Sequence, residues 1–330
     1  MLIYIMGRGH SGSTILDVML GNSAACESVG QLVTGLLKET EGHVCACGTP
    51  MQDCPYWAAV RQAFTEISAL DWRQTAMALA EHSHIRNLPH TLLARPGSPA
   101  MRQLAEGSID LERAIARASG KPHVVDSSKD STRGLMLLRF APEARVVHLV
   151  RDPRRLVASY YWRFKEWGGY FNFLRRIYYL PSMLVPLMLL TALSWTAGNV
   201  FCELARCFAR ERTLRIRYED LCEAPAAELG RIARAFDIPL DDAIAKVTNG
   251  EPLIIGHNVG GNQIRTEGAV TFTPGKGREH AMPRWLELVT VACCWPLMLA
   301  YGYKLREPEG HEPQQQTGMS REAPSRPMDS

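Results

Sequence analysis

Short apolar runs rich in β-forming residues recur along the chain, and each leads into glycines, hydroxyls or basic residues. The runs that we interpret as strands or strand ends are residues 2–6, 124–125, 144–150 and 214–221. Segments of helical character, such as residues 15–20 and 156–162, separate them. Strands that alternate with helices in this way predict an α/β fold with a parallel, doubly wound sheet.

The composition excludes several classes of protein. The chain has 330 residues, of which 46% are hydrophobic and 22% charged, so a disordered or collagen-like protein is excluded. A net charge of only +3 argues against a uniformly basic nucleic-acid surface, and we expect no nucleic-acid partner. Nine cysteines are too few for a small scaffold held together by disulfides.

The two ends of the chain differ in character. The first apolar run follows Met1 directly and has neither a basic region before it nor a small-residue cleavage site, so we expect no signal peptide and a cytoplasmic protein. Residues 306–330 are rich in Pro, Gln, Ser, Glu and Arg without an apolar period. We therefore expect one domain over residues 1–305 and a disordered tail over 306–330.

A glycine-rich loop, residues 7–14 (GRGHSGST), lies between the first strand and the first helix. Glycines allow left-handed backbone conformations, and the N–H groups of the loop and of the helix start can converge on an anion. The spacing is close to that of a nucleotide-triphosphatase loop, but Ser13 stands where that motif requires lysine. The loop therefore predicts an anion cradle rather than an ATP site; a plain glycine turn is the alternative.

Basic residues and hydroxyls follow two further strands. Arg151 ends the run 144–150, and Ser159 comes eight residues later on an expected helix. Ligands of open α/β sheets bind at the carboxyl ends of the strands, so these two side chains are candidates to hold one phosphate from two sides. The alternative is a strand-ending arginine with Asp152 capping the helix. Lys129 follows another strand end, at 124–125.

Taken together, these motifs resemble those of sulfotransferases that use 3′-phosphoadenosine-5′-phosphosulfate (PAPS). Residues 7–14 are similar to the family's 5′-phosphosulfate loop, and Arg151-Asp152-Pro153 with Ser159 to its 3′-phosphate motif. Further similar segments are residues 218–221 with Pro225, 257–265 and 301–303. The resemblance implies a P-loop-like three-layer α/β fold with a central parallel sheet flanked by helices. It also implies metal-independent transfer of a sulfuryl group from PAPS to a hydroxyl or amine.

The resemblance carries a set of site residues with it. The side chains and loop residues that it assigns to PAPS binding are Arg8, Gly9, His10, Ser11, Gly12, Ser13, Thr14, Arg151, Ser159, Tyr218 and Arg265. The candidates for catalysis are His10, Lys129 and Asp126. His10 stands where the family has lysine or arginine, and an imidazolium is able to stabilise the transferred group in the same way. Otherwise Arg8 or Lys129 supplies that charge.

The general base of the acceptor is not assigned by the motifs. Many relatives carry a glutamate shortly after the first helix, but Gln31 stands there in this chain and cannot accept a proton. The remaining candidates are Glu27, Glu39, Asp126 and His10.

An insert at residues 43–57 carries three cysteines, Cys45, Cys47 and Cys54, in a pattern that resembles an insert of many bacterial relatives. Together with His43 they offer four soft ligands, which is enough for zinc. The C-x-C spacing is tighter than that of most structural zinc sites, so a disulfide or buried thiols are equally open. We expect no required metal and a structural role for the cysteine insert.

Residues 177–202 contain no charged side chain and are long enough to span a bilayer. A span here would place the glycine loop and Arg151 on one side and Tyr218 on the other, and Pro181 and Pro186 would break the helix. The segment is therefore interpreted as core or acceptor pocket, or else as a peripheral membrane contact within residues 163–202. In the second case the basic residues that face lipid are Arg163, Lys165, Arg175 and Arg176.

The acceptor remains unidentified, and a small molecule, a lipid or a glycan all fit an apolar lining. Two other functions remain as alternatives: a P-loop nucleotide kinase or hydrolase, and a non-catalytic, membrane-associated nucleotide-binding protein. The second is favoured by His10 and Gln31, which differ from the residues that the resembled family has at these two positions. The sequence does not reveal the oligomeric state.

Overall fold

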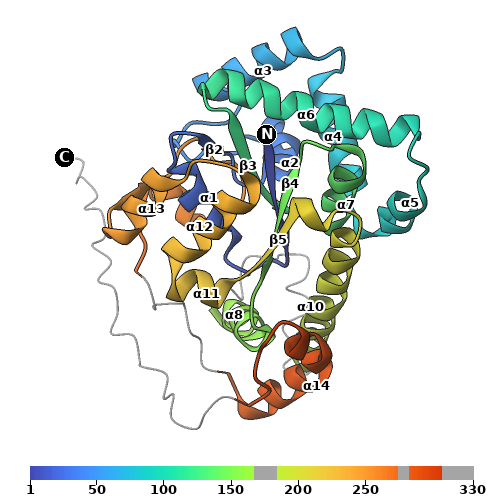
Figure 1. Ribbon diagram of the computed structural model, residues 1–330, viewed down its shortest axis with the longest axis vertical. Helices are drawn as coiled ribbons and strands as arrows, with labels where there is room; N and C mark the ends of the chain where they lie inside the picture. The colour runs from blue at the N-terminus through green and yellow to red at the C-terminus, as the bar shows by residue number, and fades with distance from the viewer. Residues whose placement is uncertain (167–183, 274–281, 307–330) are drawn as a thin grey trace, which may run out of the picture.

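A computed structural model describes residues 1–166, 184–273 and 282–306. Figure 1 shows helices packed on both sides of a central sheet. The expected disordered tail lies outside the described residues, apart from Arg306.

Five parallel strands form the sheet, in the order β2-β3-β1-β4-β5. They are β1 (Leu2–Gly7), β2 (Cys26–Ser28), β3 (His123–Lys129), β4 (Arg145–Val150) and β5 (Thr213–Arg217). A separate antiparallel pair consists of β6 (Pro252–Ile254) and β7 (Ala269–Thr271). The predicted fold class, a parallel α/β sheet between helical layers, is confirmed.

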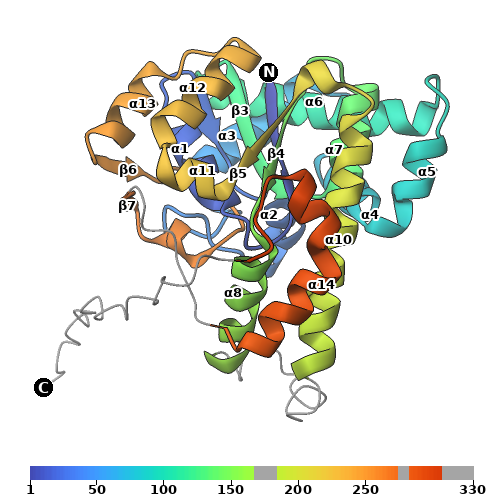
Figure 2. The ribbon, with the colours of Figure 1, turned by 60° about the horizontal axis from the view of Figure 1, so that its bottom comes forward.

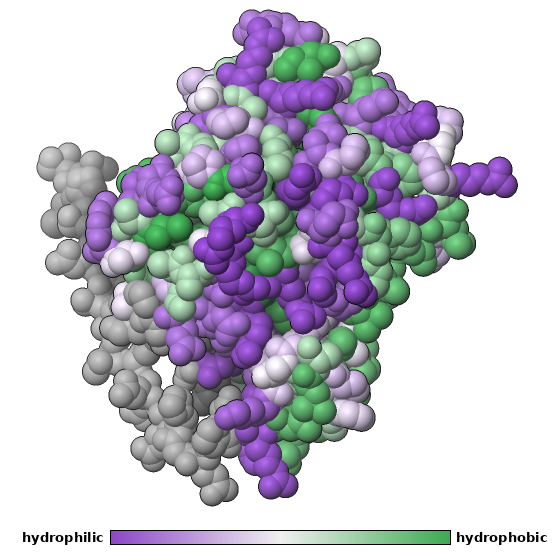
Figure 3. Space-filling view, viewed as in Figure 1, coloured by the Kyte–Doolittle hydropathy of each residue, from purple (hydrophilic) through white to green (hydrophobic). Residues whose placement is uncertain are grey.

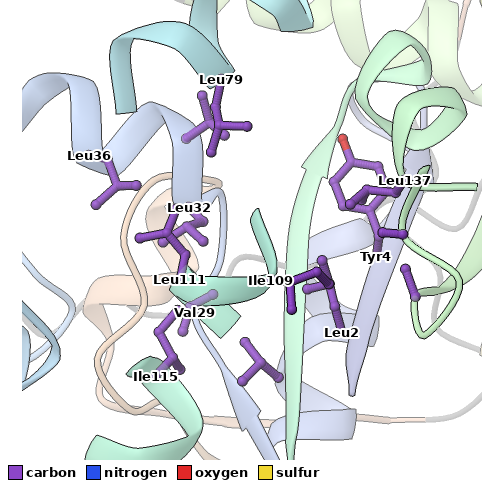
Figure 4. Close-up of a cluster of buried hydrophobic side chains, with 14 of the residues drawn as sticks. Leu2, Tyr4, Val29, Leu32, Leu36, Leu79, Ile109, Leu111, Ile115 and Leu137 are labelled. Carbon is purple, nitrogen blue, oxygen red and sulfur yellow. The ribbon is translucent and has the colours of Figure 1, made fainter. Parts of the chain in front are cut away.

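Side chains of β1 alternate between two hydrophobic cores, as a strand with both faces covered requires. Leu2, Tyr4 and Met6 face one core, which Figure 4 shows in part. Ile3 and Ile5 face the other. Because β1 is the middle strand and almost fully buried, the loop that follows it emerges at the centre of the carboxyl edge of the sheet.

Helices supply the two covering layers. The first core is closed by α2 (Leu32–Lys38), α3 (Pro55–Ile67), α4 (Trp72–Ser83), α5 (Leu88–Leu93), α6 (Pro99–Ser119) and α7 (Ser131–Phe140). The second is closed by α1 (Ser13–Gly21), α11 (Tyr218–Glu223), α12 (Pro225–Phe236) and α13 (Asp241–Thr248).

A third cluster of buried side chains lies beyond the carboxyl edge of the sheet. It joins α8 (Pro153–Glu166), α10 (Leu184–Arg206) and α14 (Arg284–Ala300), which Figure 2 shows side by side. Trp195 of α10 is fully buried in this cluster. These three helices therefore flank the carboxyl edge of the sheet, where the glycine loop and Arg151 lie.

Three local expectations are corrected. The segment Tyr218–Leu221, expected within a strand, is the start of helix α11, because β5 ends at Arg217. Helix α8 begins at Pro153 rather than at residue 156, and proline is well accommodated in a first helical turn. Pro186 does not break its helix either, because α10 begins only two residues earlier, at Leu184. Pro181 lies outside the described residues.

Candidate active site

The glycine loop joins β1 to α1 and takes a left-handed backbone at two positions. His10 has φ 65° and Gly12 has φ 87°. Gly12 caps α1, whose helix starts at Ser13. The first N–H groups of a helix have no partner within it, and they carry the positive end of the helix dipole. The loop residues assigned to PAPS therefore surround a helix start that favours an anion.

The loop and the residues after β4 meet directly. Arg151 Nη1 donates to the backbone carbonyl oxygen of His10 at 2.7 Å. His10 Nδ1 and Ser159 Oγ are 2.9 Å apart. The two motifs that the sequence assigns to opposite ends of one nucleotide are thus adjacent, although about 140 residues separate them.

The imidazole of His10 is held on three sides. Its ring lies 4.1 Å from the ring of Tyr160. Arg163 Nη1 is 3.1 Å from His10 Nε2. Since a guanidinium only donates hydrogen bonds, Nε2 is the acceptor of this contact.

Tyr218 supports the loop from the side of α11. An added Cβ at Gly12 would lie 2.1 Å from the Tyr218 ring, so glycine is required there by space as well as by φ. The guanidinium of Arg151 lies over the same ring, 4.6 Å from its centroid. Tyr218 thereby orients both the loop and Arg151.

Arg8 extends toward helix α10. Its Nη2 donates to Ser194 Oγ at 2.9 Å, and an added Cβ at Gly198 would lie 2.3 Å from its Cδ. Trp195 Nε1 of the same helix donates to the carbonyl oxygen of Arg151 at 2.9 Å. Helix α10 thus contacts both predicted anion-binding segments.

Lys129 and Asp126 lie at the end of β3 in different settings. Lys129 has φ 79°, and burial lowers its pKa although the charges of Asp130, Asp17 and Asp126 raise it. Asp126 is fully buried and forms an ion pair with Arg133. Its other oxygen accepts from the backbone and hydroxyl of Ser128 at 2.9 and 2.6 Å. Both oxygens of Asp126 are therefore already engaged.

Asp17 of α1 is a titratable group that the sequence analysis did not single out. It is fully buried, and this burial raises its pKa to about 7 in spite of hydrogen bonds from Ser28 and Asn258. The sequence signal that could have singled out Asp17 is its acidic side chain within the otherwise apolar run 15–20.

The other candidate bases are ion-paired. Glu27 binds Lys121 Nζ at 2.9 Å, and Glu39 pairs with Arg61.

Gln31 precedes α2 and lies near the glycine loop. An added Cβ at Gly261 would be 3.8 Å from the amide nitrogen of Gln31 and 3.5 Å from the hydroxyl of Thr14, so both side chains lie beside Gly261.

Arg265 and the cysteine insert lie together. Arg265 Nη1 donates to the carbonyl oxygen of Val44 at 2.8 Å. Cys45, Cys47 and Cys54 gather around His257, and the ligand atoms of all four residues are within 4.8 Å of one another. The expected fourth member, His43, is not part of this group. The sequence contained His257 within the segment 257–265, but the pairing spans about 200 residues and no local pattern reveals it.

Helix α10 has the length and hydropathy of a membrane-spanning helix, and only 22% of its most apolar window is buried. Its polar contacts to Arg8 and Arg151 join it to the sheet edge. Figure 3 shows hydrophobic surface over α10 and α14. The exposed large side chains there are Val185, Leu189, Leu190, Leu193, Val200, Leu204, Trp285, Leu288, Trp295 and Leu299. Helix α14 is therefore buried on one face only. Lys165, Arg175 and Arg176 fall outside the described side chains.

Comparison with known proteins gives one decisive match: a sequence model described as "Sulfotransferase family" matches residues 3–242. No curated protein sequence matches significantly. Among solved structures, the sulfotransferase domain of the Synechococcus PCC 7002 olefin synthase has 18% identity and a TM-score of 0.48, covering 92% of this chain and 95% of that one. The sulfotransferase domain from the curacin biosynthetic pathway has 19% identity and a TM-score of 0.47, covering 92% and 98%. With TM-scores below 0.5, these two similarities add nothing to the family match.

Proposed function

Because the chain belongs to the sulfotransferase family, we propose that it transfers a sulfuryl group from PAPS to a hydroxyl or amine of an acceptor. The observation that carries this proposal is the contact between the two anion-binding segments, Arg151 Nη1 to the His10 carbonyl at 2.7 Å and Ser159 to the His10 ring at 2.9 Å. A nucleotide with phosphates on both its 3′ and 5′ positions needs two such segments side by side.

The residues present fit a ligand with two anionic ends. The N–H groups of the loop and the start of α1 fit the 5′-phosphosulfate, and Gly12 leaves room for the Tyr218 ring that supports the loop. Arg151 and Ser159 fit the 3′-phosphate. PAPS supplies an activated sulfuryl group when bound. Ser13 in place of lysine makes ATP the poorer ligand.

We assign the contact with the transferred group to His10 and Lys129. Arg163 Nη1 lies 3.1 Å from Nε2 and Ser159 Oγ lies 2.9 Å from Nδ1 of the His10 ring, so both ring nitrogens are positioned by neighbours. A nearby anion favours the charged imidazole, which is the form that stabilises the transferred group. Asp126 instead orients the end of β3 through Arg133.

The experiment is calorimetric titration with adenosine 3′,5′-bisphosphate and with ATP, followed by transfer from radiolabelled PAPS to a metabolite extract. Binding of the bisphosphate but not of ATP, with label transferred, is the expected result. Tighter binding of ATP would favour a nucleotide kinase or hydrolase. Bisphosphate binding without any transfer would favour a non-catalytic nucleotide-binding protein.

We further propose that the enzyme is cytoplasmic and contacts a membrane through the exposed apolar face of α10 and α14, where a lipid or lipid-linked acceptor is reached. Ten large hydrophobic side chains are exposed on these two packed helices, and large exposed apolar patches mark sites of membrane or protein contact. Flotation with phosphatidylcholine vesicles, with and without phosphatidylglycerol, tests this. Leu190→Glu on α10 should reduce binding, while Leu93→Glu on α5, exposed at 80%, should not.

A further inference from the structure

The cysteine insert and the loop 256–262 meet in a compact cluster outside the proposed nucleotide site. Cys54 Sγ and Cys45 Sγ lie 3.4 and 3.7 Å from His257 Nδ1, and Cys47 Sγ lies 3.7 Å from Cys54 Sγ. All nine cysteines of the chain are described, and all are free thiols. Four soft donors from two distant segments thus face one point.

These distances match the edges of a zinc tetrahedron. With Zn–S about 2.3 Å and Zn–N about 2.0–2.1 Å, ideal tetrahedral geometry places sulfurs about 3.8 Å apart and sulfur and nitrogen about 3.5 Å apart. The observed separations are 3.7 Å between the Cys47 and Cys54 sulfurs, and 3.4 and 3.7 Å from the Cys54 and Cys45 sulfurs to His257 Nδ1. All four ligand atoms lie within 4.8 Å of one another. A disulfide needs about 2.05 Å between its sulfurs, so the cluster has the spacing of metal ligands.

We propose that Cys45, Cys47, Cys54 and Nδ1 of His257 bind one structural Zn²⁺ ion. Four protein ligands close the coordination sphere, and closed sites are structural rather than catalytic. The proposal does not depend on the proposed sulfuryl transfer.

The backbone around the cysteines suits thiolate ligands. Gly48 has φ 89°, and the N–H of Cys45 donates to the Thr49 carbonyl at 2.9 Å, which closes a tight turn around Cys47. Cys54 is the N-cap of the 13-residue helix α3, and a helix N-terminus favours negative charge on its sulfur. The turn and the helix start thus place the three sulfurs around one point, beside His257.

The histidine is held in place by its neighbours. The ring of Tyr56 stacks on the His257 ring at 4.5 Å with an interplanar angle of 6°. Trp57 Nε1 donates to the His257 carbonyl at 3.0 Å, and the N–H of Ala46 donates to the Asn258 carbonyl at 3.0 Å. Such neighbouring contacts orient metal ligands, and these join the insert to the histidine segment on both sides.

The segment that the ion would fix also supports α1, the helix that follows the nucleotide loop. Asn258 Nδ2 donates to Asp17 of α1 at 2.7 Å and to Ser28 at 2.8 Å. The N–H of Val259 donates to the Val29 carbonyl at 2.9 Å. Through the residues that follow His257, the site therefore stabilises the position of α1 and of the chain at the end of β2. Three thiolates and one zinc ion leave one negative charge, and Arg265 lies close enough to interact with Cys45.

The test is metal analysis of the full chain purified from zinc-supplemented medium without chelator. We expect one zinc ion per chain, released by a thiol-modifying reagent, and Co²⁺ substitution should give the visible ligand-field bands of a tetrahedral thiolate site. Cys54→Ser and His257→Ala should lower the zinc content at least tenfold. Cys207→Ser, at an exposed cysteine elsewhere, should leave it unchanged.

Several outcomes would overturn the proposal. One is wild-type protein without stoichiometric zinc and without Co²⁺ bands. Another is an intact mass two daltons low under non-reducing conditions, which indicates a disulfide. If the variants do not fold, the wild-type zinc content and Co²⁺ spectrum still decide. None of these measurements uses PAPS, so failure of the sulfotransferase proposal would leave them unaffected.

Discussion

Arg151 Nη1 donates a hydrogen bond of 2.7 Å to the backbone carbonyl oxygen of His10. The bond joins the loop after β1 to the end of β4, two neighbouring strands of the sheet. Because Arg151 binds the backbone and not the side chain of His10, a substitution that tolerates the left-handed φ of 65° leaves this anchor in place. The imidazole is thus separable from the anchor, and the roles of the two residues can be tested independently.

Arg151→Ala should weaken the binding of adenosine 3′,5′-bisphosphate. A hydrogen bond to a charged group contributes about 1.5–3 kcal/mol, so Kd should rise roughly 10- to 100-fold. Calorimetric titration measures this directly. Arg145→Ala, at the other end of β4, is the matched control and should bind normally. Equal affinities in both variants would remove Arg151 from the 3′-phosphate site.

His10→Ala should mainly slow turnover. Removal of one hydrogen-bond donor that stabilises the transition state lowers kcat by about 10²–10³-fold. The affinity for the bisphosphate should stay within a few-fold of the wild-type value. His10→Lys, which places the family's usual cation at this position, should recover more activity than alanine. Normal turnover in His10→Ala would show that another cation, such as Lys129, performs the role.

Gly12→Ala should disrupt the anion cradle. The new Cβ would lie 2.1 Å from the Tyr218 ring at a φ of 87°. Left-handed strain costs about 1–3 kcal/mol, and the displaced ring also orients Arg151, so bisphosphate affinity should fall at least tenfold.

Gly120→Ala provides the control for Gly12→Ala, because it has a φ of 73° with open space around its Cβ. Only the left-handed strain remains there, so Gly120→Ala should lower Tm less than Gly12→Ala and leave binding intact. Unchanged affinity in Gly12→Ala would argue that the loop does not hold the nucleotide.

Asp17→Asn should change how stability depends on pH. The pKa of Asp17 is raised by burial from 3.8 to about 7, so the folded state binds its proton more tightly than the unfolded state. The stability that this gives is complete below about pH 4 and is lost as pH rises toward about 7. Urea unfolding at pH 5 and pH 7.5 should therefore show wild type losing more stability than Asp17→Asn.

Asp242→Asn is the control for that pH experiment. Burial opposes ionisation of Asp242, but hydrogen bonds from the N–H groups of Ala24 and Ala243 lower its pKa. Its contribution is therefore lost only as pH falls below 4, and the difference from wild type should be constant between pH 5 and pH 7.5. An identical pH slope in Asp17→Asn and wild type would refute the account of Asp17.

The sequence by itself determined the parallel sheet, the glycine loop before α1 and the candidate residues at the strand ends. These features depend on alternation of apolar residues and on the positions of glycine and proline, which act within a few residues of one another. Only the tertiary structure decided that residues 218–221 form a helix, that His257 and not His43 joins the cysteines, and that Arg265 lies against Val44. Packing between segments more than two hundred residues apart determines the contacts of His257 and Arg265, and no local pattern encodes such a pairing.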